Sequence, residues 1–203
     1  MVGVGLGTAE HSMSREGGIM LKTKHDRLAY DLVAQMLHWL TLLLLGLQFG
    51  LAWSAPERLA SPDALISLHL SFGVVVLIVA LVRLAWRVIR PAPALPADLP
   101  DWQRLGSHAL QVLLYVLLIA LPILGWLWAG ERGWPVSLFG FAALPDLASR
   151  GSSFGRLAGD LHGLLSNVLL VLVGVHVLGA LYHAVVRRDG VMQRMLPAPR
   201  RPT

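Results

Sequence analysis

The chain has 203 residues, 55% of them apolar, with 17 basic and 12 acidic side chains and no cysteine. The charges avoid four stretches, residues 32–53, 64–82, 105–130 and 161–186. A soluble domain spreads charges along its amphipathic elements. This pattern therefore excludes a soluble enzyme, a disordered chain and a nucleic-acid-binding domain, and the lack of cysteine excludes disulfides, thiolate metal sites and covalently attached haem.

Each charge-free stretch is long enough to cross a hydrocarbon core of about 30 Å as a helix rising about 1.5 Å per residue. We expect an all-α, integral membrane four-helix bundle over residues 30–187. An N-terminal extension, 1–29, precedes it, and a basic cytoplasmic tail, 188–203, follows. The extension has no convincing signal peptide, and Met13 or Met20 is an alternative start.

The first predicted helix, residues 32–53, carries His38, and a short outer loop broken by Pro56 and Pro62 follows it. The second helix, 64–86, carries His69. Arg83 follows His69 by almost four helical turns and so lies on the same face, nearer the inner end.

The third helix, 106–129, contains Pro122, where we expect a kink, and His108 near its inner end, which we interpret as an interfacial residue. A long outer loop over 130–159 follows, and its segment 134–147 is rich in aromatic residues and is expected at the membrane surface. An inner loop over 90–100, rich in proline, connects the second and third helices.

The fourth helix, 160–186, carries three histidines on one face. His162 and His176 are separated by fourteen residues, almost four turns or about 21 Å along the axis, and His183 follows seven residues later. Measured from the middle of each helix, His69 and His162 lie toward the outer side, whereas His38 and His176 lie toward the inner side. Depth therefore pairs His69 with His162 and His38 with His176; pairing His38 with His183 matches less well.

Histidines in a membrane segment are rare and usually face the bundle interior. A pair of facing imidazoles suits one haem, because neutral imidazole is a good axial ligand to iron. Zinc would require further ligands, which the helices do not supply, and hydrogen-bonded packing is the alternative for any single histidine. Gly73, one turn from His69, favours close approach of a flat macrocycle, although such glycines also serve helix packing.

Two arginines of the second helix extend this interpretation. Arg83 is a candidate partner for anionic haem propionates. Arg87 is expected to be an interfacial residue that sets topology. Twelve basic residues fall before the first helix, between the second and third, or after the fourth, whereas four fall on the opposite side. By the positive-inside rule, both termini are cytoplasmic.

Several motifs resemble those of the bacterial cytochrome b-561 family, over residues 30–197. They are Leu-His-Trp-Leu at 37–40, His-Leu-Ser-Phe-Gly at 69–73, Arg-Leu-Ala-Trp-Arg at 83–87, the segment 114–126, Leu-His-Gly-Leu-Leu at 161–165, the segment 174–183 that ends in Leu-Tyr-His, and the segment 188–197 that begins with Arg-Asp-Gly. Four histidine-bearing motifs in order, on the first, second and fourth helices, make the resemblance specific.

The resemblance implies a di-haem b cytochrome of the bacterial inner membrane with the same two ligand pairs. It also implies electron exchange with ubiquinone, oxidation of superoxide at the outer face, and a place for His183 near the inner haem and quinone. We therefore predict an oxidoreductase, a superoxide:ubiquinone oxidoreductase by family, with the lipid bilayer and ubiquinone as partners.

Two other functions remain open from the sequence. The chain could be an anchor subunit that passes electrons from a dehydrogenase or hydrogenase to quinone, or a transporter or structural membrane protein without a redox cofactor. A partner redox subunit would indicate the first alternative, and a purified protein without a haem spectrum would indicate the second.

Overall fold

The computed structural model describes residues 29–55, 62–93 and 99–196. Nearly all of the predicted N-terminal extension, parts of two connecting loops and the end of the basic tail lie outside these residues. The main helices are α2 (Leu32–Ser54), α3 (Ala64–Ile89), α4 (Asp101–Arg132) and α5 (Ser153–Tyr182). A π-helical turn, η1 (His183–Arg187), continues α5, and a short 3-10 helix, η2 (Met192–Met195), follows.

Side-chain caps begin three of the four long helices. Asp31 accepts a hydrogen bond from the Ala34 N–H, Asp63 from the Ile66 N–H and Ser152 from the Gly155 N–H. Such caps satisfy amide groups that have no partner within the helix. They place the starts of α2, α3 and α5 at polar residues that flank the apolar stretches.

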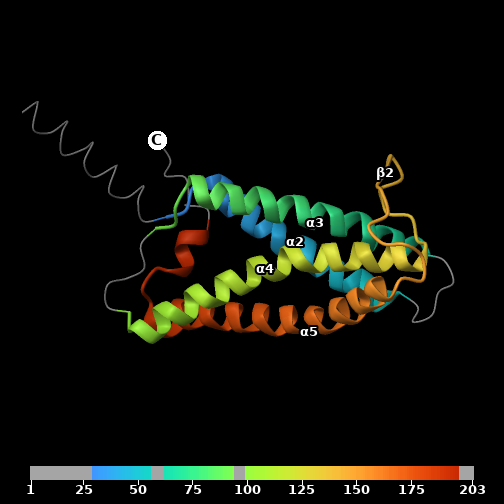
Figure 1. Ribbon diagram of the computed structural model, residues 1–203. Helices are drawn as coiled ribbons and strands as arrows, with labels where there is room; N and C mark the ends of the chain where they lie inside the picture. Colours follow the sequence, from blue (N-terminus) through green and yellow to red (C-terminus); the bar gives the residue numbers. More distant parts are fainter. Residues whose placement is uncertain (1–28, 56–61, 94–98, 197–203) are drawn as a thin grey trace, which may run out of the picture.

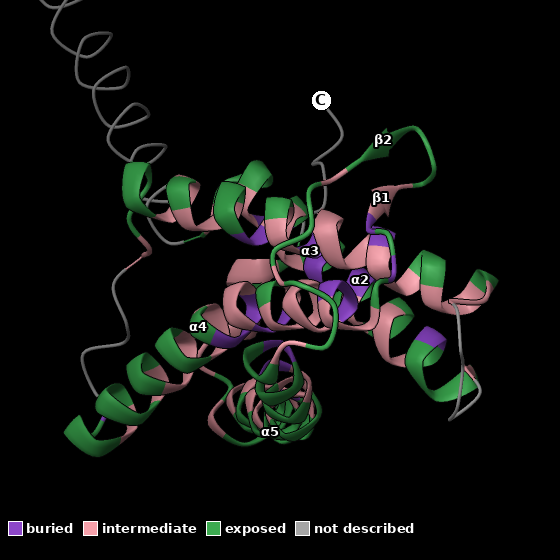
Figure 2. Ribbon diagram, turned by 45° about the vertical axis from the view of Figure 1, so that its right-hand side comes forward, coloured by how far each residue is buried: buried purple, intermediate pink, exposed green. Residues whose placement is uncertain are grey.

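The four helices form a bundle in which α2 packs on α3, α3 on α4 and α4 on α5 (Figure 1). The backbone of α5 stands off from α2 and α3, which leaves room for cavities between them. All four helices are long and apolar enough to cross a membrane. Large apolar side chains face outward, for example Leu43 and Leu178 at 70% and 67% exposure, as Figure 2 illustrates for the bundle as a whole. The predicted helical membrane bundle is confirmed.

The outer loop is shorter than predicted. Residues 130–159 were expected to form a loop, but α4 continues to Arg132 and α5 begins at Ser153. The prediction was wrong because charged residues end a hydrocarbon-spanning segment without ending a helix, which continues until a cap stops it. Gly133, with φ 69°, ends α4, and the Ser152 cap begins α5.

A two-stranded hairpin occupies the remaining connection, with β1 (Ser137–Leu138) antiparallel to β2 (Ala142–Ala143). The hairpin is attached to α3 through Ser71, whose hydroxyl lies 2.8 Å from the Ser137 carbonyl oxygen, and through the Phe72 and Phe139 rings. Figure 1 shows it projecting sideways from the bundle.

α4 continues through Pro122 and changes direction near its middle (Figure 1). Proline has no N–H to donate and its ring crowds the preceding turn, which accounts for a bend at this position.

Candidate functional site

We call the end of the bundle that carries the connections 55–63 and 133–152 the outer end, and the opposite end the inner end. Two cavities lie inside the bundle at different levels. The outer cavity, of about 430 Å³, is lined by His69 and His162. The inner cavity, of about 390 Å³, is lined by His38 and His176. Both volumes fall in the range of small-molecule sites.

In the outer cavity, the ring centroids of His69 and His162 are 6.2 Å apart. His69 Nδ1 lies 3.2 Å from the Gln48 carbonyl oxygen, and His162 Nδ1 lies 2.9 Å from the Leu121 carbonyl oxygen. A carbonyl only accepts hydrogen bonds, so both Nδ1 atoms carry the proton. Each Nε2 therefore keeps its lone pair, which is the form that coordinates a metal.

Gly125 makes the approach of His162 to α4 possible. A Cβ atom at this position would lie 3.0 Å from His162 Cε1 and 3.1 Å from its Nδ1. Because glycine has no Cβ, the ring reaches the Leu121 carbonyl one turn earlier on the same helix. Gly125 also lines the outer cavity, so a backbone feature of α4 sets the orientation of a side chain of α5.

In the inner cavity, the ring centroids of His38 and His176 are 6.0 Å apart. Arg83 Nη2 donates to His38 Nδ1 at 2.9 Å, and the Arg83 guanidinium lies over the Tyr115 ring at 5.4 Å. Since a guanidinium has no acceptor, Nδ1 of His38 accepts and its proton is on Nε2.

Arg87 lines the inner cavity, and its role as an interfacial residue that sets topology stays a prediction. Its two terminal nitrogens donate to the Tyr30 hydroxyl at 3.0 Å and to Gln111 Oε1 at 3.1 Å. Arg87 follows Arg83 by four residues, so it shares the face that looks into the bundle.

Three leucines separate the two cavities. Leu45, Leu118 and Leu169 line both of them. Leu169 is 2% exposed and packs with Leu117 and Leu121 of α4. The two histidine pairs are thus divided by one apolar layer.

The residues present fit two metal-centred macrocycles. Two imidazole nitrogens that each lie about 2.0–2.1 Å from one first-row metal ion put their ring centroids roughly 6 Å apart, as both pairs do. Within the described ranges, no group of three or more His, Cys, Asp or Glu side chains could hold a metal. This favours a cofactor that supplies its other ligands. Gln48 Oε1, buried at the outer cavity without a hydrogen-bond partner, is a polar atom to which a bound group could bond.

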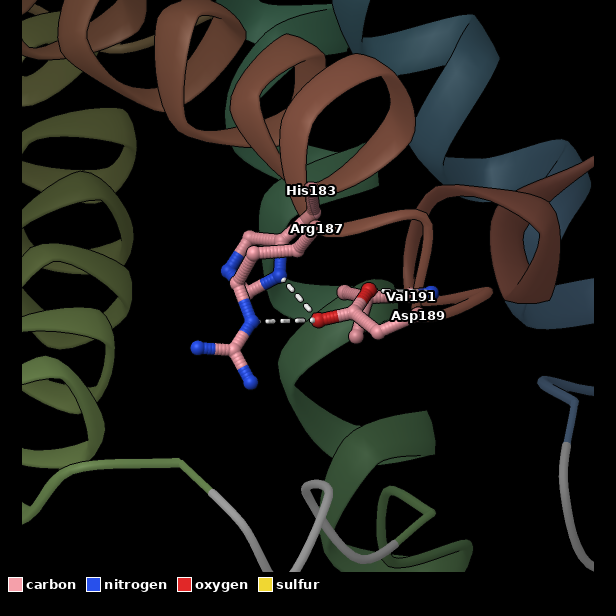
Figure 3. Close-up of polar contacts among 4 residues, drawn as sticks. All are labelled: His183, Arg187, Asp189 and Val191. Carbon is pink, nitrogen blue, oxygen red and sulfur yellow. Dashed lines mark hydrogen bonds and ion pairs between the residues drawn. The ribbon is translucent and has the colours of Figure 1, made fainter.

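His183 lies at the inner end but does not line the inner cavity. Its Nδ1 lies 2.7 Å from Asp189 Oδ2, which also accepts from Arg187 Nε at 3.1 Å (Figure 3). Burial alone would raise the pKa of Asp189, but hydrogen bonds from His183, the Val191 N–H and Arg187 outweigh it and lower that pKa below its usual value. His108 is exposed on α4.

The sequence interpretation missed several residues of this site. Gly125 and the carbonyl groups of Gln48 and Leu121 carry no chemical signature, since any residue has a carbonyl. The sequence offered one indication: Gly125 lies one helical turn after Leu121, on the part of α4 that packs against His162. Gly73, which was predicted, does line the outer cavity, and a Cβ there would lie 3.2 Å from Gln48 Nε2.

Residues 29–198 match the family described as prokaryotic cytochrome b561. The chain belongs to this family. It is 32% identical over 180 residues to cytochrome b561 homolog 2 of Escherichia coli (strain K12), an overlap of 82% of this chain and 90% of that protein. It is 31% identical over 170 residues to the probable superoxide oxidase CybB of Yersinia pestis, an overlap of 81% and 93%. Cytochrome b561 homolog 1 of E. coli is 26% identical over 164 residues.

The predicted family is therefore confirmed. As a cytochrome b561, the chain is a multi-pass electron-transfer protein of the bacterial membrane, and membership implies haem b. The roles of the six named residues, His38, His69, His162, His176, Arg83 and His183, stay predictions, as do the number of haems and the orientation of the termini.

Proposed function

We propose that this cytochrome b561 carries two haem b groups and passes electrons between the outer face of the bacterial inner membrane and ubiquinone. His69 and His162 are the axial ligands of the outer haem, and His38 and His176 those of the inner haem. The proposal rests on one observation: two cavities lie at different levels along α5, and each is lined by two histidines.

Each haem, when bound, would supply one-electron redox chemistry, with two histidines available to hold its iron. That ligation favours electron transfer over oxygen binding, because binding of oxygen needs an open position. The protein's contribution is orientation and exclusion of water. The Gln48 and Leu121 carbonyls hold the Nδ1–H groups of His69 and His162. In the inner cavity, Arg83 and Arg87 supply positive charge for the haem propionates.

The layer of Leu45, Leu118 and Leu169 keeps the two sites apart and dry. An apolar layer without polar side chains leaves no path for water or ions between the two sides of the membrane. Electrons can cross such a layer between two nearby cofactors, whereas solvated charges cannot. This arrangement suits a conductor of electrons that does not leak protons.

Superoxide is the proposed electron donor, since one relative bears the name probable superoxide oxidase. One cation beside the outer cavity supports this choice. The Arg132 guanidinium lies over the Trp134 ring at 3.9 Å and near the Trp128 ring at 5.7 Å, and both tryptophans line the outer cavity. A cation at the mouth of a low-dielectric cavity attracts an anion. Arg156 contributes less, because Glu131 lies 3.5 Å from it.

Ubiquinone is the proposed acceptor at the inner end, with both termini on the cytoplasmic side. The support is the family resemblance, the excess of basic residues at this end and the location of His183 there. An anchor subunit serving a dehydrogenase or hydrogenase would use the same ligands, and would differ in co-purifying with a redox partner.

The ligand assignment is tested by a reduced-minus-oxidised spectrum with haem stoichiometry for the wild type, His38→Ala and His162→Ala. Each variant should lose one haem, and not the same one. His108→Ala is the matched control, because His108 is an exposed histidine outside both cavities. Loss of both haems or of neither in the two ligand variants contradicts the pairing.

The donor and acceptor are tested by mixing the anaerobic oxidised protein with a pulse of superoxide, with ubiquinone-1 present. Prompt reduction of the haem, followed by quinol formation, is expected. Reduction no faster than spontaneous superoxide decay allows would eliminate superoxide as the donor. A soluble redox subunit that co-purifies and reduces the haem would support the anchor function instead.

A further inference from the structure

A second histidine-centred arrangement lies below the inner cavity and is not part of either ligand pair. His183 and Arg187 project from η1 and converge on one oxygen of Asp189, at 2.7 and 3.1 Å. Figure 3 shows both side chains turned toward Asp189, which comes from the segment that follows the helix. The side chains of His183 and Asp189 are 15% and 11% exposed, so the contact is largely shielded from water.

Local backbone geometry builds this contact. A π-helical turn brings residues four apart nearly into line, so His183 and Arg187 point the same way. Arg188 and Gly190 then take positive φ values of 51° and 76°, which reverses the chain. The second carboxylate oxygen of Asp189 accepts the Val191 N–H at 3.2 Å and closes the turn.

The contact fixes the tautomer of His183. The Asp189 carboxylate is ionised and only accepts, so Nδ1 of His183 carries a proton and donates it to the carboxylate. Nε2, the other ring nitrogen, points away from Asp189 in Figure 3. It is therefore the ring atom that can take up a proton and release it elsewhere.

The pair lies at the edge of the inner cavity. Ala180 and Leu181, just before His183, line that cavity, and so do Val191 and Met192, just after Asp189. The segment that returns from the turn stays against the bundle, because Trp39 Nε1 donates to the Met195 carbonyl at 2.9 Å. Residues on both sides of the His183–Asp189 contact in the sequence therefore line the inner cavity, and the contact lies next to it.

We propose that Asp189 is a positioning residue that holds His183 in the tautomer required to protonate the quinone at the inner end. The inference rests on the proposed function, in which ubiquinone is the acceptor. Two superoxide anions lose one electron each and become two dioxygen molecules, and ubiquinone takes up these two electrons and two protons to become the quinol. His183 delivers these protons one at a time: Nε2 takes up a proton from hydronium in the bulk solvent, and the Nε2–H bond breaks as an O–H bond forms on the reduced quinone. Nδ1–H stays bonded to Asp189 throughout, and a second such cycle supplies the second proton.

The competing role of Asp189 is structural, since it closes the turn through Val191. Asp189→Asn separates the two roles. Asparagine closes the same kind of turn through its side-chain oxygen. Its NH₂ group, however, would face His183 Nδ1 as a donor and favour the tautomer with the proton on Nε2. A structural role predicts little change in this variant, whereas a positioning role predicts loss of proton transfer.

The experiment compares wild type, Asp189→Asn and Asp189→Glu, all haem-loaded and dithionite-reduced, in anaerobic mixing with ubiquinone-1. Asp63→Asn is the matched control, because Asp63 caps a helix through the Ile66 N–H and, among the described residues, is not hydrogen-bonded to a histidine. Haem spectra should be the same in all four. The maximal rate of haem reoxidation should fall about tenfold to hundredfold in Asp189→Asn, with little change in the half-saturating quinone concentration. It should recover in Asp189→Glu.

A second readout does not depend on turnover. ¹⁵N spectra of histidine-labelled protein, with His183 assigned from its missing signals in His183→Gln, should show the proton on Nδ1 in wild type and on Nε2 in Asp189→Asn. In the His183→Gln background, Asp189→Asn should cause no further loss of rate.

The outcomes separate the inference from the proposed function. If the reduced wild type is not reoxidised by quinone, the acceptor assignment fails, and the inference fails with it. If wild type reacts but Asp189→Asn reacts equally fast, or keeps the wild-type tautomer, only the inference is overturned. A rate loss that persists undiminished in the His183→Gln background likewise overturns it, because Asp189 would then act without the histidine.

Discussion

A methyl group added at Gly125 would strike the imidazole ring of His162. The added Cβ would lie 3.0 Å from Cε1 and 3.1 Å from Nδ1, whereas carbon atoms pack best at about 3.5–4.0 Å. The ring must therefore retreat by about 0.5 Å. Its 2.9 Å hydrogen bond to the Leu121 carbonyl would lengthen to about 3.4 Å, beyond the usual range.

Gly125→Ala should consequently weaken the outer haem and leave the inner one intact. Loss of the hydrogen bond that orients a ligating histidine typically costs about tenfold to hundredfold in affinity. The effect is measured as the rate of haem transfer to excess apomyoglobin, resolved by the spectra of the two haems. A bulkier change, Gly125→Leu, should leave one haem per chain.

Gly106→Ala is the matched control, since a Cβ at Gly106 meets nothing within 4 Å and both glycines are in α4. Alanine favours a helix over glycine by about 1 kcal/mol at either position. Any difference between the two variants therefore reports the contact with His162. Equal haem retention in Gly125→Ala, Gly106→Ala and wild type would refute the role assigned to Gly125.

Three further predictions follow from contacts in and below the inner cavity. Arg83→Gln should lower the midpoint potential of the inner haem by roughly tens of millivolts in a redox titration, since removal of a nearby cation favours the oxidised form; an unchanged potential would place the charge of Arg83 away from the haem. Leu169→Ala should destabilise the protein by about 2–5 kcal/mol in unfolding by detergent, because it opens the layer shared by both cavities; Val171→Ala, at an exposed position, is its control. The pKa of Asp189 is lower in the folded protein than in the unfolded chain. The ionised carboxylate therefore stabilises the fold fully when the pH is above the unfolded pKa of about 3.9, and this stabilisation is lost as the pH falls through the lowered pKa of the folded state. The gap in melting temperature between wild type and Asp189→Asn should therefore narrow below pH 4, and a constant gap would contradict this linkage.

Helical periodicity and depth were sufficient to anticipate which histidines meet. His162 and His176 share a face because fourteen residues are close to four turns, and a membrane constrains depth as a soluble fold does not. The structure brings His69 beside His162 and His38 beside His176, as that arithmetic expected. Positions along the helices needed only the sequence, because rise per residue is nearly constant.

The contacts that orient those rings could not be anticipated in the same way. They involve backbone carbonyls of Gln48 and Leu121 and the missing side chain of Gly125, which depend on how closely two helices approach. The Asp189 contact depends on a π-helical turn and a positive φ at Arg188, a conformation that arginine seldom adopts. Helix ends were also misplaced, because charge marks the membrane boundary and caps mark the helix boundary.

The two histidine pairs differ in how they are held, and this difference bears on their roles. Backbone carbonyls orient His69 and His162, and the missing side chain of Gly125 gives His162 the room to reach its carbonyl. In the inner site, a charged side chain, Arg83, bonds to His38. The properties of the inner site should therefore respond more strongly to substitution of this neighbouring side chain. One histidine pair held by backbone groups and one that contacts a charged side chain are compatible with the proposal that the quinone reaction, with its protons, takes place at the inner end.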